Sequence, residues 1–216
     1  MRSPAGLRRP QREGPLASPA TFFQFRVALR EIVPTIWRRI LVPGDYTFWD
    51  LHVAIQDAMG WLDYHLHLFR VESPLIDAAA QIGIPDEDFF EGDERILPGW
   101  EVPVAAYLFE PGDTAVYEYD FGDGWEHDLT LEAILPDETG KHFPICLAGQ
   151  RACPPEDCGG VGGYENVIEV LRNPDHEEHA SMLSWVGGSY DPAGFDPGRV
   201  KFEDPAQRWK KAFEGR

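Results

Sequence analysis

Two runs of alternating apolar and polar residues near the start of the chain constrain its fold most strongly. Residues 23–29 carry apolar side chains at every second position, from Phe23 to Leu29. Residues 35–42 repeat this period of two directly after Pro34. Because successive side chains of a strand point to opposite faces of a sheet, the pattern predicts two half-buried strands joined as a hairpin around Val33-Pro34.

The next segment has the signals of a helix with defined ends. Thr47 is a favourable N-cap, and Gly60 is a residue that readily ends a helix. Between them the apolar residues gather on one side at helical spacing. Further strands are predicted over residues 65–71, 115–119 and 126–135, and further helices over 164–171, 175–185 and 205–213.

This order of elements predicts the fold class. Strands, one early helix, more strands and then helices favour an α+β fold, because the regular strand-helix alternation of a parallel α/β fold is absent. We therefore expect an antiparallel or mixed sheet packed with one early helix and C-terminal helices. Residues 74–99 are acidic and contain Pro85 and Pro98, so only short elements are expected there.

Length and composition predict one folded domain with a tail. Residues 1–20 are rich in Pro and Arg and have no periodicity, which indicates a disordered basic tail. Residues 21–216 are long enough, in a chain with 43% hydrophobic residues, for a single domain with a substantial core. No membrane span or signal peptide is expected, and three cysteines are too few for a disulfide framework, so a cytoplasmic location is expected.

The charge distribution argues against duplex nucleic acid as a partner. The net charge is −18, and from residue 41 onward 11 basic residues face 35 acidic ones. Since nucleic-acid affinity comes largely from Lys and Arg that neutralise phosphates, so acidic a body would repel a duplex. The simplest explanation of the charge is solubility.

One stretch of ten residues has the composition of a functional site. Residues 119–128 combine aromatic residues, glycines, four acidic residues and one histidine. A strand that enters a turn could bury the aromatic rings and present the carboxylates at a common rim. Together with two histidines expected on one face of the 65–71 strand, the candidate site residues are His65, His67, Tyr119, Asp120, Asp123, Trp125, Glu126 and His127. The alternative is structural, with His127 opposite Asp120 in a hydrogen-bonded pair that fixes the turn.

The cysteines suggest a metal site as a second hypothesis. Cys146, Cys153 and Cys158 lie in a Gly- and Pro-rich segment, residues 136–163, that is expected to be a long loop. Three thiolates could hold a zinc ion with His142 or His127 as the fourth ligand, although the spacing is not that of common zinc sites. The alternative is that the cysteines are small packing residues.

Several separated motifs together resemble one family. They occur in a constant order along residues 21–200 and are Ile36-Trp37-Arg38-Arg39, Asp50-Leu51-His52, Met59-Gly60-Trp61, His65-Leu66-His67, Tyr117 to His127, Cys146-Leu147-Ala148-Gly149, Cys153 to Gly160, Gly163-Tyr164 and Phe195-Asp196-Pro197. The chain resembles the plasmid pRiA4b ORF-3-like family, some members of which are labelled insertion-sequence passenger TnpR proteins. The resemblance implies a single α+β domain of roll type, associated with plasmids and mobile elements, and it implies no established activity.

The TnpR label does not agree with the residues that recombination requires. A tyrosine recombinase needs Arg and His residues around its nucleophile to stabilise a phosphoryl-transfer transition state. Basic residues are scarce beyond residue 40. A serine recombinase needs a nucleophilic serine near the N-terminus with an arginine cluster, and the only serines of the body are Ser73, Ser181, Ser184 and Ser189. We therefore interpret the label as one of genetic neighbourhood.

Two classes of function follow from these patterns. The first is a non-catalytic module that binds a protein, a peptide or another ligand through its acidic face and through aromatic residues expected to be exposed, namely Trp61, Trp125 and Tyr164. The second is a small metal-dependent, hydrolase-like enzyme that uses zinc, the His/Asp hairpin and the cysteine loop. We favour the first, because no complete catalytic set can be assembled without tertiary contacts.

Overall fold

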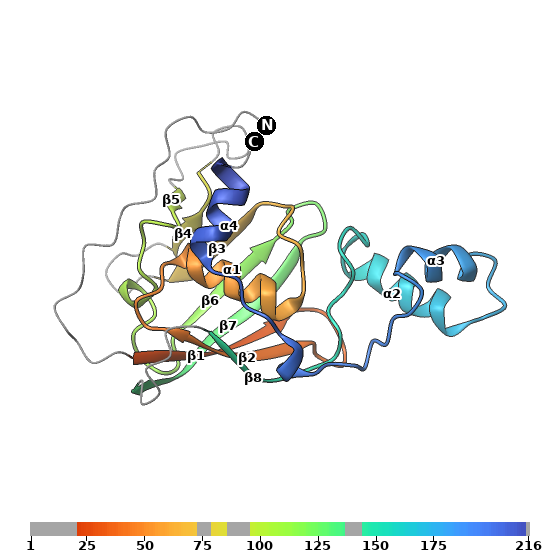
Figure 1. Ribbon diagram of the computed structural model, residues 1–216, viewed down its shortest axis with the longest axis horizontal. Coiled ribbons are helices and arrows are strands. Elements are labelled where there is room, and N and C mark those ends of the chain that lie inside the picture. The colour runs from red at the N-terminus through yellow and green to blue at the C-terminus, as the bar shows by residue number, and fades with distance from the viewer. Residues whose placement is uncertain (1–20, 73–78, 86–95, 137–143, 215–216) are drawn as a thin grey trace.

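The fold is built on one mixed sheet, seen in the computed structural model of residues 21–72, 79–85, 96–136 and 144–214 (Figure 1). The sheet has eight strands in the order β5-β4-β3-β6-β7-β1-β2-β8. They are β1 Thr21–Leu29, β2 Trp37–Pro43, β3 His67–Glu72, β4 Ala79–Gly83, β5 Ile96–Pro98, β6 Thr114–Tyr119, β7 Trp125–Pro136 and β8 Ile145–Gln150. Only β4 and β5 pair in parallel, so the predicted α+β class with a mixed sheet is confirmed. The predicted tail, residues 1–20, lies outside the described residues.

Both predicted hairpins are present, and their registers place the apolar positions on the core face. β1 and β2 pair around Val33-Pro34, whose peptide bond is cis. Phe25 of β1 lies opposite Ile40 of β2 and Leu131 of β7, and all three side chains are fully buried. The alternating apolar residues of the sequence are therefore the ones that form the inner face of the sheet.

Helix α1, Phe48–Met59, crosses one face of the sheet (Figure 1). Thr47 and Asp50 form a reciprocal capping box at its start, and Gly60 ends it with a left-handed φ of 97°. This confirms the predicted helix and both of its ends. All residues of α1 except Asp57 are buried, because the C-terminal helix covers the side that faces away from the sheet.

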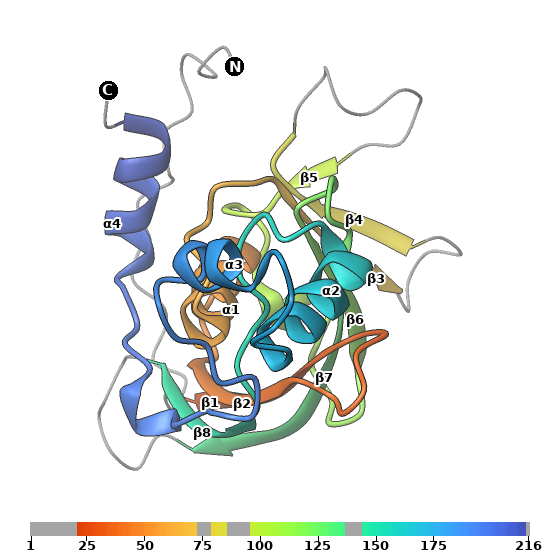
Figure 2. The same ribbon diagram turned by 90° about the vertical axis from the view of Figure 1, so that its right-hand side faces the viewer.

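The C-terminal helix fastens the end of the chain to α1. Helix α4, Pro205–Trp209, continues as a π-helical turn over Lys210–Glu214 and lies beside α1 (Figure 2). The Trp209 ring is buried against Trp49 and Trp100, with ring centroids 5.2 and 4.9 Å apart. The predicted terminal helix is thus confirmed.

Two further helices project from one end of the molecule (Figure 1). They are α2, Gly160–Arg172, and α3, His179–Trp185. Helix α2 extends beyond both ends of the predicted helix 164–171, whereas α3 fills only the C-terminal part of the predicted segment 175–185. Short 3-10 turns cover Val104–Ala106 and Pro197–Arg199. Within the described ranges, no helix has the length and apolar character needed to cross a bilayer.

The prediction of an unbroken loop over residues 136–163 is wrong. Strand β8 lies within it and pairs antiparallel with β2 at the edge of the sheet. Gly149 admits the ring of Phe195, since a Cβ at Gly149 would lie 2.4 Å from that ring. The buried guanidinium of Arg38 stacks on the same ring at 3.7 Å from its centroid. Strand β8 owes its position to these distant contacts, which explains why it has no clear pattern of its own.

Candidate functional site

The turn between β6 and β7 has buried aromatic residues at both ends, leaves Phe121 half-buried and orders its first carboxylate. Tyr119 is fully buried and Trp125 is 1% exposed. Asp120 has a φ of 56°, in the left-handed region, and its Oδ1 accepts hydrogen bonds from the N–H groups of Gly122 and Asp123 at 3.0 and 3.3 Å. Since Oδ1 holds the turn, Oδ2 is left to face the neighbouring loop.

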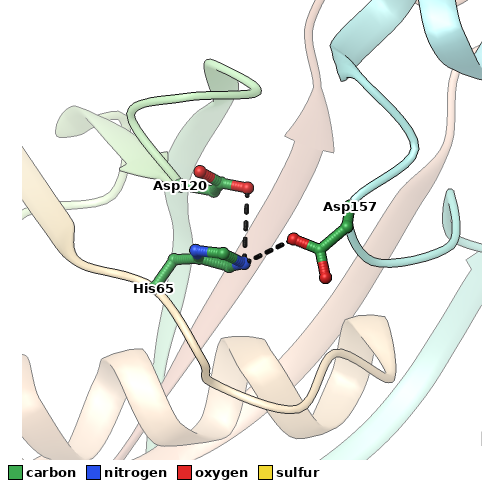
Figure 3. A group of neighbouring side chains, drawn as sticks. All are labelled: His65, Asp120 and Asp157. Carbon is green, nitrogen blue, oxygen red and sulfur yellow. Dashed lines mark hydrogen bonds and ion pairs between the residues drawn. The ribbon is translucent and has the colours of Figure 1, made fainter.

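Three side chains from distant segments converge beside this turn (Figure 3). His65 comes from the loop between α1 and β3, Asp120 from the turn, and Asp157 from the loop before α2. His65 Nε2 lies 2.9 Å from Asp157 Oδ1 and 3.6 Å from Asp120 Oδ2. One donor atom of each residue lies within 4.8 Å of the other two, and no other such group of three occurs in the part of the chain that the structure describes.

Glu156 and Tyr119 form the wall next to these three residues. Tyr119 donates a hydrogen bond to Glu156 Oε1 at 3.1 Å and accepts one from the backbone N–H of Tyr64 at 3.0 Å. Glu156 Oε1 also accepts from the backbone N–H of Leu62 at 2.6 Å. Burial raises the pKa of the Glu156 carboxyl, and burial together with the nearby Glu156 raises the pKa of Tyr119. The loop that carries His65 is therefore hydrogen-bonded both to Tyr119, which precedes the turn, and to Glu156, which precedes Asp157.

Glycines allow the loop before α2 to approach the turn. The backbone N–H of Gly159 donates to Asp123 Oδ2 at 3.0 Å. A Cβ at Gly160 would lie 2.5 Å from the Asp123 carbonyl oxygen, and Gly160 has a φ of 68°. The glycine run and the acidic hairpin, which are far apart in the sequence, are therefore parts of one docked structure.

His67 does not join His65, contrary to the prediction that the two share a strand face. Strand β3 begins at His67, so His65 lies in the preceding loop and its side chain takes another direction. The His67 ring is 2% exposed and stacks on the ring of His52 at 3.5 Å between centroids. Burial lowers the pKa of His67 well below its usual value.

His127 is also a core residue, and it does not pair with Asp120. It lies opposite Tyr117 in β6, and its Nδ1 lies 3.2 Å from the Tyr117 carbonyl oxygen. Complete burial lowers the pKa of His127 to about 4. The ring is therefore neutral near pH 7. His127 has a structural role in the core, but its partner is the Tyr117 carbonyl oxygen and not Asp120.

Glu126 lies on the other face of the sheet from His127, since the two are adjacent in one strand. Its carboxylate binds Arg30 at 2.7 Å and Arg70 at 2.5 Å. The hydrogen bond from Arg30 lowers the pKa of Glu126. Glu126 is therefore part of an arginine-bridged surface cluster and not of the His65 group.

The three cysteines carry free, partly exposed thiols. They do not form a group of three donors within 4.8 Å among the described residues, and His142 lies outside those residues. Burial raises the pKa of all three thiols, that of Cys158 to about 12. They are protonated at neutral pH, a form that does not bind metal without losing a proton.

The aromatic residues that we expected on the surface are inside. Trp61, Trp125 and Tyr164 are between 1% and 4% exposed. Among the described residues, the exposed rings are instead Tyr64, beside His65, Phe109, and Trp185 of α3. A surface for a ligand near the site would therefore use Tyr64 and not the three predicted residues.

An imidazole and two carboxylates from separate segments are a ligand set suited to a divalent cation. Nitrogen and oxygen donors of this kind suit Zn²⁺ and Mn²⁺. The patterns predicted His65 and Asp120 but missed Asp157. The acidic pair between Cys153 and Cys158 is the one signal for it in the sequence.

Comparisons with known proteins give one family model, one relative and one solved structure that match most of the chain. The model of the family described as plasmid pRiA4b ORF-3-like protein matches residues 21–199. An uncharacterised protein, y4hQ, of Sinorhizobium fredii is 35% identical over 196 residues, which are 89% of this chain and 96% of that protein. The crystal structure of a protein of unknown function, MM3350, from Methanosarcina mazei Go1 aligns with a TM-score of 0.77 at 40% identity, covering 86% of this chain and 100% of that chain.

Proposed function

Since the chain belongs to the plasmid pRiA4b ORF-3-like family, whose relatives above are described without an activity, we propose a function from the site itself. The protein is a non-catalytic ligand-binding module that holds a divalent cation between His65, Asp120 and Asp157. The convergence of these three donors within 4.8 Å is the observation that carries the proposal.

The number of carboxylates and the exposure of the donors support a cation at this place. Two carboxylates face one imidazole nitrogen, and a divalent ion between them would neutralise both negative charges. The Asp120 side chain is 9% exposed, while Asp157 is 64% exposed. The ion would therefore have a rigid ligand on the sheet side and an adaptable ligand on the loop side, with room for an external ligand from solvent.

The same arrangement gives the ion a structural effect. Asp157 belongs to the loop before α2, and His65 and Asp120 belong to the body of the sheet, so the ion would clamp the loop to the body. An ion that binds only the folded state raises stability in proportion to the logarithm of its concentration. Cation binding and resistance to unfolding should consequently rise together.

Isothermal titration of chelator-treated protein with Mn²⁺ or Zn²⁺ tests the proposal. We expect one site per chain, and we expect His65→Gln and Asp157→Asn each to weaken binding at least tenfold, because each removes one of three donors. Asp175→Asn is the matched control, since Asp175 is an exposed acid outside the cluster. Equal affinity of wild type and Asp157→Asn would refute the site.

Glu156 supports a second candidate, a metal-dependent hydrolase. Its pKa is raised by burial and it lies next in sequence to Asp157, so it could act as a general base toward a cation-bound water. Hydrolysis of bis(4-nitrophenyl) phosphate with Mn²⁺ present distinguishes the candidates. Turnover that Glu156→Gln abolishes, with cation affinity unchanged, would favour the enzyme; its absence leaves the binding module.

A further inference from the structure

A second pocket, which shares no residue with the proposed cation site, lies between the tip of the β1-β2 hairpin and helix α2. Its volume is about 530 Å³, which is within the usual range of small-molecule sites. The hairpin contributes Val33 and Pro34, and α2 contributes Tyr164 and Ile168. Arg151, which follows β8, closes the third side.

Arg151 is held in this pocket without a protein partner. Its Nε atom is buried and has no hydrogen bond, and no ion pair of Arg151 occurs among the described residues. The residue also has a φ of 71°, which is unfavourable for a side chain other than glycine. A buried donor without an acceptor is costly, and strained residues of this kind concentrate at binding sites.

A second residue of the pocket also carries a buried polar atom. Tyr164 is 3% exposed, and its hydroxyl makes no hydrogen bond of ordinary geometry, although it lies close enough to the Tyr190 hydroxyl to raise the pKa of that group. The neighbouring hydroxyl of Tyr190 donates to the carbonyl oxygen of Cys153 at 2.9 Å. An oxygen atom of a ligand in the pocket could accept from Arg151 and lie near Tyr164.

Helix α2 contributes both positive and negative side chains to the lining of the pocket. Arg172 is a second arginine at the rim without an ion pair in the described part of the chain, although the protein has a net charge of −18. Glu165 and Glu169 also line the pocket at a spacing of four residues, which places like charges side by side on a helix. A positive group of a ligand between these two carboxylates would remove their repulsion.

The remaining wall is apolar and exposed. Val33 is 93% exposed and stands beside Pro34 and Ile168. An exposed apolar wall next to unpaired charges of both signs fits a molecule that carries the same three features. We propose that this pocket binds an apolar zwitterion, a free amino acid with an aliphatic side chain or a short peptide of such residues, with the carboxylate at Arg151 and Arg172 and the ammonium at Glu165 and Glu169.

Calorimetric titration with leucine and with its two singly charged analogues tests each feature. The probes are leucine, 4-methylpentanoate, which lacks the ammonium, 3-methylbutylamine, which lacks the carboxylate, and leucyl-leucine. We expect leucine or leucyl-leucine to bind one to one, and either analogue to bind about tenfold more weakly, since each loses one charged hydrogen bond. The tighter of leucine and leucyl-leucine identifies the source of the zwitterion.

Variants locate the binding and separate it from folding. Arg172→Ala and Glu169→Gln change exposed residues and should each weaken leucine or dipeptide binding about tenfold without a change in thermal midpoint. Arg151→Ala should weaken it further, and its fold is checked by circular dichroism. Arg199→Ala, an exposed arginine outside the pocket, should bind as wild type does. Equal binding of leucine and 4-methylpentanoate, no binding of either zwitterion, or unchanged binding in Arg172→Ala would overturn the proposal.

Discussion

The imidazole rings of His52 and His67 stack in the core with 3.5 Å between their centroids and 9° between their planes. His52 Nδ1 lies 2.8 Å from the Tyr117 hydroxyl and its Nε2 lies 2.8 Å from Asp63 Oδ1. Two positive rings at such a distance would repel strongly in a region of low dielectric. The core therefore contains a histidine pair that is compatible with at most one charge.

The buried histidines make stability fall in mild acid. The pKa of His127 is lowered from 6.5 to about 4 by burial, so between these pH values the unfolded chain binds a proton that the folded chain does not. The free energy of unfolding should thus decrease as pH falls through this window, by about 3 kcal/mol from His127 alone. Urea titrations at several pH values should show a shallower dependence for His127→Phe than for wild type. The half-buried surface residue His176 provides the control, since His176→Ala should keep the full slope. Equal slopes in all three proteins would contradict this cause.

Gly162 and Gly163, in the first turn of α2, should respond in opposite ways to substitution by alanine. A Cβ at Gly163 would lie 1.8 Å from the carbonyl oxygen of Cys158, whereas one at Gly162 would meet nothing within 4 Å. Gly163→Ala should destabilise the fold by about 1–3 kcal/mol through overpacking. Gly162→Ala should stabilise it by about 0.5–1 kcal/mol because alanine favours the helix. Urea unfolding measures both, and equal effects would show that the loop does not pack as described.

Arg208 should be the main electrostatic anchor of the C-terminal helix. It binds Asp57 at 2.7 Å and Asp63 at 3.3 Å, and both carboxylates are less than 10% exposed. Arg208→Met leaves them without this cation and should cost about 3–5 kcal/mol of unfolding free energy. Lys210→Ala is the exposed control. A loss below about 0.5 kcal/mol in Arg208→Met, of the size seen for ordinary surface substitutions, would mean that the helix is held by Trp209 alone.

The thiols should not contribute to cation binding. The pKa of each cysteine is raised by burial, and the three do not converge. A variant with serine at positions 146, 153 and 158 should keep the Mn²⁺ or Zn²⁺ affinity of the wild type within about twofold, since no donor is lost. Loss of binding in this variant, with the fold intact by circular dichroism, would return the site to the cysteines.

Local patterns predicted most of the secondary structure because those elements are stabilised by nearby residues. Helix α1 has its own caps at Thr47 and Gly60, and strands β1 and β2 carry the alternation that their burial requires. Strand β8 was missed because it depends on β2 and on the ring of Phe195, which are distant in the sequence. The pattern predicts a strand that includes His65 because the alternation begins before the point at which β3 starts to pair with β6, at His67.

Periodicity and short-range hydrogen bonds are enough to predict strands β1, β2, β3, β6 and β7 and the capped helix α1. Which ionisable groups meet depends instead on the tertiary structure. It separates His65 from His67 and His127, which are buried in the core. It also places Asp157 next to Asp120, because the glycines before α2 let that loop pack against the turn. The physical reason is that a cluster of charges forms where the chain closes a long loop, and the free energy of that closure comes from core packing that no local pattern records.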